Sequence, residues 1–339
     1  MQLATLIGCL VALLPAVAFL TVLEQLDSFR LVSLRATLLA LAAGGLIAAS
    51  SYFVNQWLMD ALSVDLATYM RVGSPAVEET LKACFVIYLF LHRRIAFLID
   101  AAIMGLAVGT GFALVENIYF LQAFEDAGLG LWIVRGFGTA IMHGAATAIF
   151  AVLAQSWTER HTRDSALAYV TGLACAIGLH TLFNHLLFAP MIATAAVMML
   201  TPITLFVVFS KSEHRIHDWV THDRHEHLAL LGTMNETYLA SPRGRFITDI
   251  VARFDGAEAE DILAYMRVHT ELVIRAEDLL LARSEGKSAI TAPEDRERFR
   301  TLHALEKKIG RMAMLALWPH LHYSRQEMAE LYELEARVS

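Results

Sequence analysis

The sequence predicts an all-α protein, a polytopic membrane bundle of about seven transmembrane helices plus a C-terminal helical soluble domain. Hydrophobic residues make up 56% of the 339 residues, and charged residues only 18%. The long apolar runs fall almost entirely within residues 1–210, and each is near the roughly 17–25 residues that a helix needs to cross the hydrocarbon. Residues 211–339 are charged and amphipathic instead. We therefore expect a membrane domain over residues 1–210 and a soluble helical domain over residues 211–339.

The apolar runs predict seven spans, at about residues 3–23, 36–54, 74–91, 96–121, 132–154, 166–188 and 191–209. No Lys or Arg precedes the first run, so we expect a retained helix rather than a cleaved secretory signal. Small residues in the second and fourth spans predict close helix contacts, and they are Gly44, Gly45, Gly105, Gly109 and Gly111. Residues 55–73 fit either an exposed loop or a short amphipathic helix in the interface, anchored by Trp57 and Tyr69.

The soluble part has helical patterns at about residues 257–266 and 293–316. The second pattern places its apolar residues three and four positions apart, at Leu302, Leu305, Ile309 and Met312. Five histidines crowd the start of this part, at positions 214, 217, 222, 225 and 227. Their spacing could suit a metal, but no cysteine accompanies them and their charged neighbours favour a solvated helix face. Such a domain could regulate the membrane part, recruit a partner or form a homo-oligomer.

Charge and cysteine content exclude several classes of protein. The net charge is −7 and no continuous basic patch is present, so no nucleic-acid partner is expected. The three cysteines, Cys9, Cys84 and Cys175, all fall within apolar runs. They form neither a disulfide framework nor a zinc-site spacing. A small apolar role in helix packing accounts for them.

The basic residues of the short loops predict the orientation in the membrane. They gather in the first, third and fifth loops and at the start of the tail, at Arg30, Arg35, Arg93, Arg94, Arg160, Arg163, Lys211 and Arg215. The even-numbered loops carry acidic residues and a single arginine. By the positive-inside rule, the N-terminus lies outside and the C-terminal domain is cytoplasmic. A multi-pass protein of a bacterial inner membrane fits this pattern.

Five ionisable side chains interrupt the apolar spans, namely Glu78, Glu79, Glu116, His143 and His180. Each costs about 3 kcal/mol in hydrocarbon, so five on four spans indicate a polar site inside the bundle. With the predicted orientation, a rise of about 1.5 Å per residue places all five in the outer half of the membrane. Unrelated structural residues would not be expected to agree in depth.

Helical spacing and side-chain chemistry suggest roles for these residues. Glu78 and Lys82 are four apart and can pair on one face, as can His180 and Asn184. A buried carboxylate can act first as base and then as acid, so Glu78 or Glu79 is expected to activate water while Lys82 orients the other. Two histidines and one carboxylate also form a standard hydrolytic zinc set.

In these residues the chain resembles the PrsW family of intramembrane proteases, relatives of the CAAX prenyl protease superfamily. The family pattern is Glu-Glu-x-x-Lys, then Phe-x-x-x-Glu-Asn, then a His, then His-x-x-x-Asp or Asn. Its counterparts are Glu78, Glu79 and Lys82, then Phe112, Glu116 and Asn117, then His143, and finally His180 with Asn184. The match covers about residues 70–190.

The resemblance implies an intramembrane endopeptidase that acts on membrane-protein substrates within the lipid bilayer. By analogy, these would be single-pass proteins such as anti-sigma factors, cut near their extracytoplasmic side. The catalytic residues would be Glu78, Glu79, Lys82, Asn117, His143, His180 and Asn184. Metal ligands would be Glu116, His143 and His180, with zinc as the divalent metal if one is bound. A metal-free glutamate-dependent mechanism, as in the related prenyl proteases, is the alternative.

Three other classes of membrane protein also use ionisable residues within their spans. A transporter or proton relay would use the same residue types, but it predicts polar groups across the full depth of the membrane rather than in one half. A cytochrome with His143 and His180 as haem ligands would leave the three glutamates without a role. A lipid-modifying enzyme without protease activity is a further alternative that the residues allow.

Overall fold

The computed structural model describes residues 3–27, 29, 31–124, 127–160, 166–186, 189–233, 256–287, 290–310, 314 and 325–338. Over these residues the chain consists of helices joined by short connections, and no strand occurs among them. The chain divides into two compact units, Met1–Ser212 and Glu213–Ser339. The predicted all-α membrane bundle with further helices after it is confirmed.

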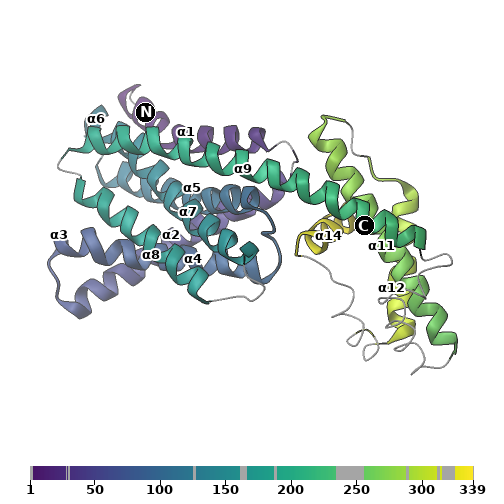
Figure 1. Cartoon of the computed structure of the whole chain (residues 1–339). Helices are drawn as coiled ribbons and strands as arrows, with labels where there is room; N and C mark the ends of the chain where they lie inside the picture. The colour runs from purple at the N-terminus through teal and green to yellow at the C-terminus, as the bar shows by residue number, and fades with distance from the viewer. Residues whose placement is uncertain are drawn as a thin grey trace. The chain divides into compact units, whose positions relative to one another are not determined.

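The first unit is a helical bundle (Figure 1). Its elements are α1 (Leu3–Leu26), α2 (Leu34–Leu62), α3 (Leu66–Thr68), η1 (Tyr69–Gly73), α4 (Ser74–Leu91), α5 (Leu98–Ala123), α6 (Leu129–Ile133), η2 (Val134–Thr139), α7 (Ala140–Arg160), α8 (Ala166–His185) and α9 (Pro190–Thr233). Six helical stretches among the described residues are long and apolar enough to cross a membrane. The α4 helix, predicted as a seventh span, is not one of them because it carries Glu78, Glu79 and Lys82.

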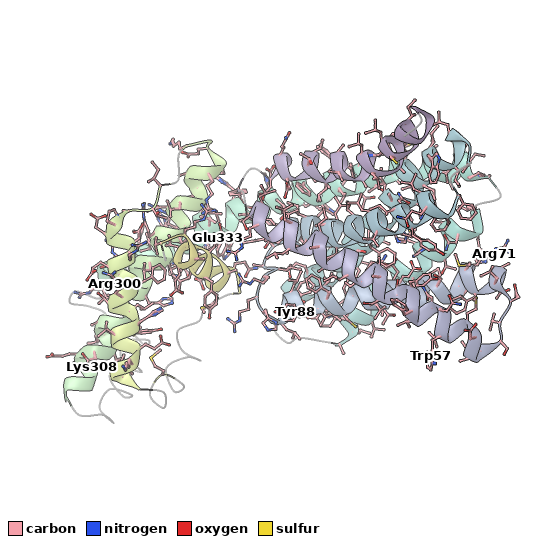
Figure 2. The ribbon with its side chains drawn as sticks, turned by 180° about the vertical axis from the view of Figure 1, so that it is seen from behind. Trp57, Arg71, Tyr88, Arg300, Lys308 and Glu333 are labelled. Atoms are coloured by element: carbon pink, nitrogen blue, oxygen red, sulfur yellow. The ribbon has the colours of Figure 1, made fainter. Side chains whose placement is uncertain are left out.

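The segment predicted as a loop or interfacial helix is largely a continuation of its neighbours. Helix α2 runs on to Leu62, and α3, η1 and α4 follow one another without a break from Leu66. Trp57 projects from the end of α2 and is 67% exposed (Figure 2), as expected of an interface anchor. Tyr69 is only 4% exposed, so its predicted role as a second anchor is wrong.

Helix α5 lies at the centre of the bundle, and glycines bring it into backbone contact with its neighbours. A Cβ added at Gly44 would lie 2.0 Å from the carbonyl oxygen of Val108, so α2 and α5 cross without side chains between them. A Cβ at Gly109 would lie 2.3 Å from the carbonyl oxygen of His143 on α7. The close approach that the sequence predicted for these glycines is therefore present, and it places His143 directly against α5.

The second unit contains the continuation of α9 together with α11 (Gly256–Ser284), α12 (Pro293–Ile309) and α14 (Arg325–Val338). The apolar faces of α11, α12 and α14 form one core, which includes Ile262, Leu272, Leu279, Phe299, Leu302, Leu331 and Leu334. The α12 helix starts at Pro293, as the sequence predicted, and ends before Gly310, whose φ of +81° suits glycine. Met312 of the predicted pattern lies outside the described residues.

One of the five clustered histidines is the centre of a polar contact inside the second unit. His227 bonds Glu277 through Nδ1 and Glu327 through Nε2, both at 2.9 Å. His227 lies 16 residues, about 24 Å, beyond Lys211, the first charged residue of α9, and so lies outside the hydrocarbon. Although burial alone would lower it, the two carboxylates raise the pKa of His227 to about 10. His222, by contrast, has 77% of its side chain exposed, as the solvated-face interpretation predicts.

Candidate active site

Two short π-helical segments lead directly into the helices that carry the polar residues. Segment η1 ends at Gly73, immediately before α4, which holds Glu78 and Glu79. Segment η2 ends at Thr139, immediately before α7, which holds His143. Insertions of this kind rotate the following residues relative to a regular helix and are frequent at functional sites.

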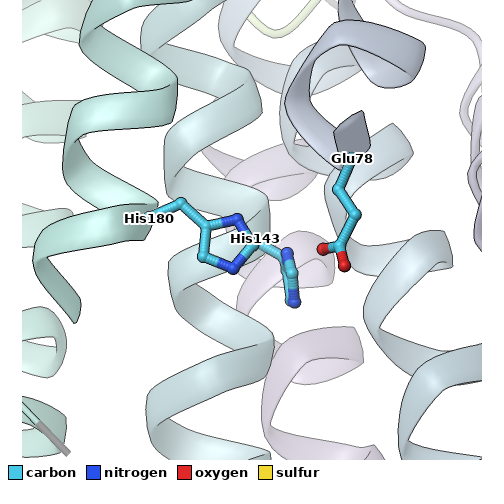
Figure 3. Close-up of side chains that lie close together, drawn as sticks. All are labelled: Glu78, His143 and His180. Carbon is cyan, nitrogen blue, oxygen red and sulfur yellow. The ribbon is translucent and has the colours of Figure 1, made fainter. Parts of the chain in front are cut away.

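The structure brings Glu78, His143 and His180 together inside the bundle (Figure 3). Each offers one ligand atom, and these atoms all lie within 4.8 Å of one another. All three side chains are buried, at 7%, 1% and 3% exposure. Among the described residues this is the group that could share a metal ion, and it combines helices α4, α7 and α8.

The Glu78 carboxylate is held through one of its two oxygens. Oε1 accepts hydrogen bonds from Ser74 Oγ at 2.5 Å and from Asn55 Nδ2 at 3.4 Å. Oε2 is buried and has no hydrogen-bond partner within the described residues. A carboxylate oxygen left unpaired beside two imidazoles is costly unless a cation or a proton donor fills the space. The donor set and this oxygen therefore fit a divalent metal.

The Glu79 carboxylate bonds Lys82 and His180 and is not one of the three converging groups. Its Oε1 accepts a hydrogen bond from Lys82 Nζ at 2.6 Å. Lys82 therefore pairs with Glu79, whereas helical spacing had suggested a pair with Glu78. The same oxygen lies 2.8 Å from His180 Nδ1. Because a carboxylate accepts, Nδ1 of His180 is the donor and Nε2 retains its lone pair. A carboxylate that orients a histidine in this way is common behind metal ligands.

His143 lies between a cation and a second carboxylate. Lys82 Nζ is 3.1 Å from Nδ1, and Glu116 Oε2 is 3.1 Å from Nε2. The ammonium donates to Nδ1, so the ring proton sits on Nε2 and points to Glu116. A metal bound through Nδ1 of His143 would therefore replace the contact with Lys82.

Glu116, which the sequence predicted as a metal ligand, does not belong to the converging group. Its Oε2 pairs with Arg135 at 2.6 Å and contacts His143. Glu116 thus contacts one of the two histidines, whereas Glu78 is the carboxylate whose ligand atom lies within 4.8 Å of both. Arg135 was not among the residues that the sequence predicted for the site. The signal for this pair was an arginine at the start of one apolar run and a glutamate within another, since charges in membrane spans are usually paired.

The two asparagines of the predicted catalytic set contact backbone carbonyls away from the cluster. Asn117 Nδ2 donates to the carbonyl of Ala12 at 2.7 Å, and its Oδ1 accepts from Arg135 Nε at 2.8 Å. Asn184 Nδ2 donates to the carbonyl of Met70 in η1 at 2.9 Å, not to His180. Both side chains therefore join helices, and neither is directed at the Glu78 carboxylate.

Carboxylates and imidazoles thus converge among helices that are long and apolar enough to cross a membrane. The family model described as PrsW family intramembrane metalloprotease matches residues 32–210, and the chain belongs to this family. It is thus a multi-pass membrane peptidase, whose substrates are membrane proteins within the lipid bilayer. The resemblance drawn from the sequence is confirmed. Searches of curated proteins and of solved structures gave no match.

Proposed function

We propose that this protease cleaves its substrates at a divalent-metal centre held by Glu78, His143 and His180. The convergence of these three ligand atoms within 4.8 Å of one another carries the proposal. The unpartnered Oε2 of Glu78 supports it, because the oxygen is buried without any other donor among the described residues. Two histidines and one carboxylate suit zinc best. Bound there, the metal would supply a Lewis acid that activates water and polarises the scissile carbonyl.

The remaining polar residues hold the ligands and move the proton. Glu79 orients His180 through Nδ1, and Lys82 balances the charge of Glu79. We assign proton transfer to Glu116, because a water molecule must reach the group that takes its proton. The Glu116 side chain is 22% exposed, whereas that of Glu79 is 1% exposed. Glu116 takes a proton from water while the hydroxyl adds to the carbonyl carbon. It returns the proton to the amine nitrogen as the C–N bond breaks. The sequence had suggested Glu78 or Glu79 for this task.

The proposed site lies on the extracytoplasmic side of a bacterial inner membrane. Glu78 and His143 lie near the beginnings of α4 and α7, whereas Glu116 and His180 lie near the ends of α5 and α8. In alternating helices these positions share one half of the membrane, and the basic loops assign that half to the outside. The substrates would be single-pass proteins such as anti-sigma factors, cut near their outer boundary. The cytoplasmic domain, residues 211–339, would regulate cleavage through self-association.

Two glutamine substitutions test the proposed division of roles. Full-length protein in proteoliposomes would be measured for bound zinc and for cleavage of a labelled single-pass substrate. We expect Glu78→Gln to lose both metal and activity, because it removes an anionic ligand. Glu116→Gln should keep the metal and lose activity, because it removes only the proton acceptor. Glu297→Gln, a matched change at a side chain that is 71% exposed in the soluble unit, should alter neither.

The opposite pattern would refute this assignment. If Glu116→Gln loses the metal and Glu78→Gln retains it, the ligand set is Glu116, His143 and His180, as the sequence had predicted. If the wild type binds no metal and a chelator leaves cleavage unchanged, the enzyme uses a metal-free glutamate mechanism. Thiol labelling of Trp57→Cys from outside intact cells, in a cysteine-free background, tests the orientation, and exclusive labelling from the cytoplasm would reverse it.

A further inference from the structure

A chain of polar side chains outside the family pattern leads to the Glu78 carboxylate. Tyr69 donates its hydroxyl to Asn55 Oδ1 at 3.0 Å. Asn55 Nδ2 donates to Ser74 Oγ at 3.2 Å and to Glu78 Oε1 at 3.4 Å. Ser74 donates to the same carboxylate oxygen at 2.5 Å. The chain thus joins α2, η1 and α4 and ends on one atom of the proposed metal ligand.

Two of the four hydrogen bonds in this chain end on Oε1 of Glu78, and the other two hold the donors Asn55 and Ser74. The carboxylate of Glu78 therefore has one oxygen held by two donors and one, Oε2, that is buried and free of donors within the described residues. The two oxygens are chemically equivalent, and a half-turn restores the same arrangement, but a partial rotation about the Cγ–Cδ bond would break both hydrogen bonds. Figure 3 shows the carboxylate directed toward the two imidazole rings in this orientation. The two donors thus fix the orientation of the carboxylate, in which the other oxygen is available to a cation.

The π-helical segment η1 is what makes this chain possible. Tyr69 is 4% exposed, and its ring lies against Gly73, where an added Cβ would be 2.7 Å from two ring atoms. Only glycine at residue 73 leaves room for the ring to turn inward toward Asn55. The same segment accepts a hydrogen bond from Asn184 at the carbonyl of Met70. Segment η1 is therefore tied to α8, the helix of His180, as well as to α2.

We propose that Ser74, Asn55 and Tyr69 are positioning residues that hold Glu78 with Oε2 available as a metal ligand. This inference rests on the proposed function, since it assumes that Glu78 binds the metal. Ser74 and Asn55 act on the carboxylate directly, and Tyr69 acts through Asn55. The competing explanation is that the chain only fastens α2 to α4 and has no effect on the metal.

Metal affinity separates the two explanations. Purified full-length protein would be stripped of metal and titrated with Zn²⁺ in competition with a chromophoric chelator, and the thermal unfolding midpoint would be measured in parallel. We expect Ser74→Ala and Asn55→Ala to weaken zinc binding about 10- to 100-fold, the range typical of residues behind metal ligands. Tyr69→Phe should weaken it less, because it acts at one remove. The visible spectrum of the Co²⁺-loaded protein should change in the same order.

Two matched variants serve as controls. Ser74→Thr keeps the hydroxyl and should restore most of the affinity that Ser74→Ala loses. Ser51→Ala removes a buried hydroxyl from the same helix as Asn55, but this hydroxyl donates to the carbonyl of Ala48 within α2, so zinc affinity should not change. If Ser74→Ala and Asn55→Ala bind zinc as the wild type does, the positioning role is refuted even when their unfolding midpoints fall.

Zinc binding by Glu78→Gln distinguishes failure of the metal centre from failure of the positioning role. Loss of zinc in Glu78→Gln, with normal zinc binding in Ser74→Ala, would leave the metal centre standing and remove only the positioning role. Equal zinc binding by the wild type and Glu78→Gln would remove the metal ligand itself and the present inference with it.

Discussion

Replacement of Gly109 by alanine tests how closely the site depends on helix packing. A Cβ at this position would lie 2.3 Å from the carbonyl oxygen and 2.6 Å from the carbonyl carbon of His143, and 2.6 Å from the Cα of Gly144. All three are backbone atoms, so no flexible side chain can move aside. Ordinary contact begins at 3.4 Å, so α7 would have to move away from α5 by about 1 Å. His143 would move with it.

The expected effect is large on catalysis and moderate on stability. Overpacking of a tight contact costs about 1–3 kcal/mol, so the bundle should still fold. A displacement of about 1 Å in a catalytic group can reduce the rate about 100-fold. Cleavage of a labelled substrate in proteoliposomes, with zinc affinity and the unfolding midpoint measured on the same preparation, would detect both effects.

Gly178→Ala provides the matched control. It makes the same substitution in α8, two residues before His180, but an added Cβ there meets nothing within 4 Å. Alanine is the better helix former by about 1 kcal/mol, so this variant should be active and at least as stable as the wild type. If Gly109→Ala cleaves substrate as fast as Gly178→Ala, the packing of α5 on α7 does not control the position of His143.

Three further predictions concern charged groups and the metal. Arg135→Gln leaves Glu116 without its buried partner, and loss of one member of such a pair costs about 3–5 kcal/mol. The unfolding midpoint of Arg135→Gln should therefore lie well below that of Arg135→Lys. Equal midpoints would contradict the role of the ion pair. His227→Gln should speed hydrogen exchange in α11 and α14, because it removes the shared partner of Glu277 and Glu327. The raised pKa of His227 means that its contribution to stability is complete below about pH 6.5 and is lost as the pH rises through about 10. Exchange should therefore rise more steeply over this range in the wild type than in His227→Gln, and parallel curves would count against the assignment. Finally, zinc at about 100 times its Kd should stabilise the metal-free protein by about 2.7 kcal/mol, whereas an unchanged unfolding midpoint would argue against a metal site.

The sequence predicted the all-α bundle and the ionisable residues inside its apolar helices. Apolar runs of membrane length are a local property, so the all-α bundle and the family could be inferred without coordinates. The cost of charge in hydrocarbon drew attention to Glu78, Glu79, Glu116, His143 and His180, and the structure brings them into one connected set of contacts. The length of α2 and the buried position of Tyr69 were missed, because polar residues such as Asn55 ended the apolar pattern before the helix ended.

The partner of each polar group was decided by tertiary structure. Helical spacing allowed Lys82 to pair with either Glu78 or Glu79. In the structure, Lys82 and His180 both contact Oε1 of Glu79. Glu116 turned to Arg135 because η2 brings a guanidinium to it, which no local pattern encodes. Asn117 and Asn184 bond carbonyls of other helices, at Ala12 and Met70. The rotation of each helix, set by glycine contacts and by the two π-helical segments, determines which side chains meet, and sequence spacing along a single helix does not contain that information.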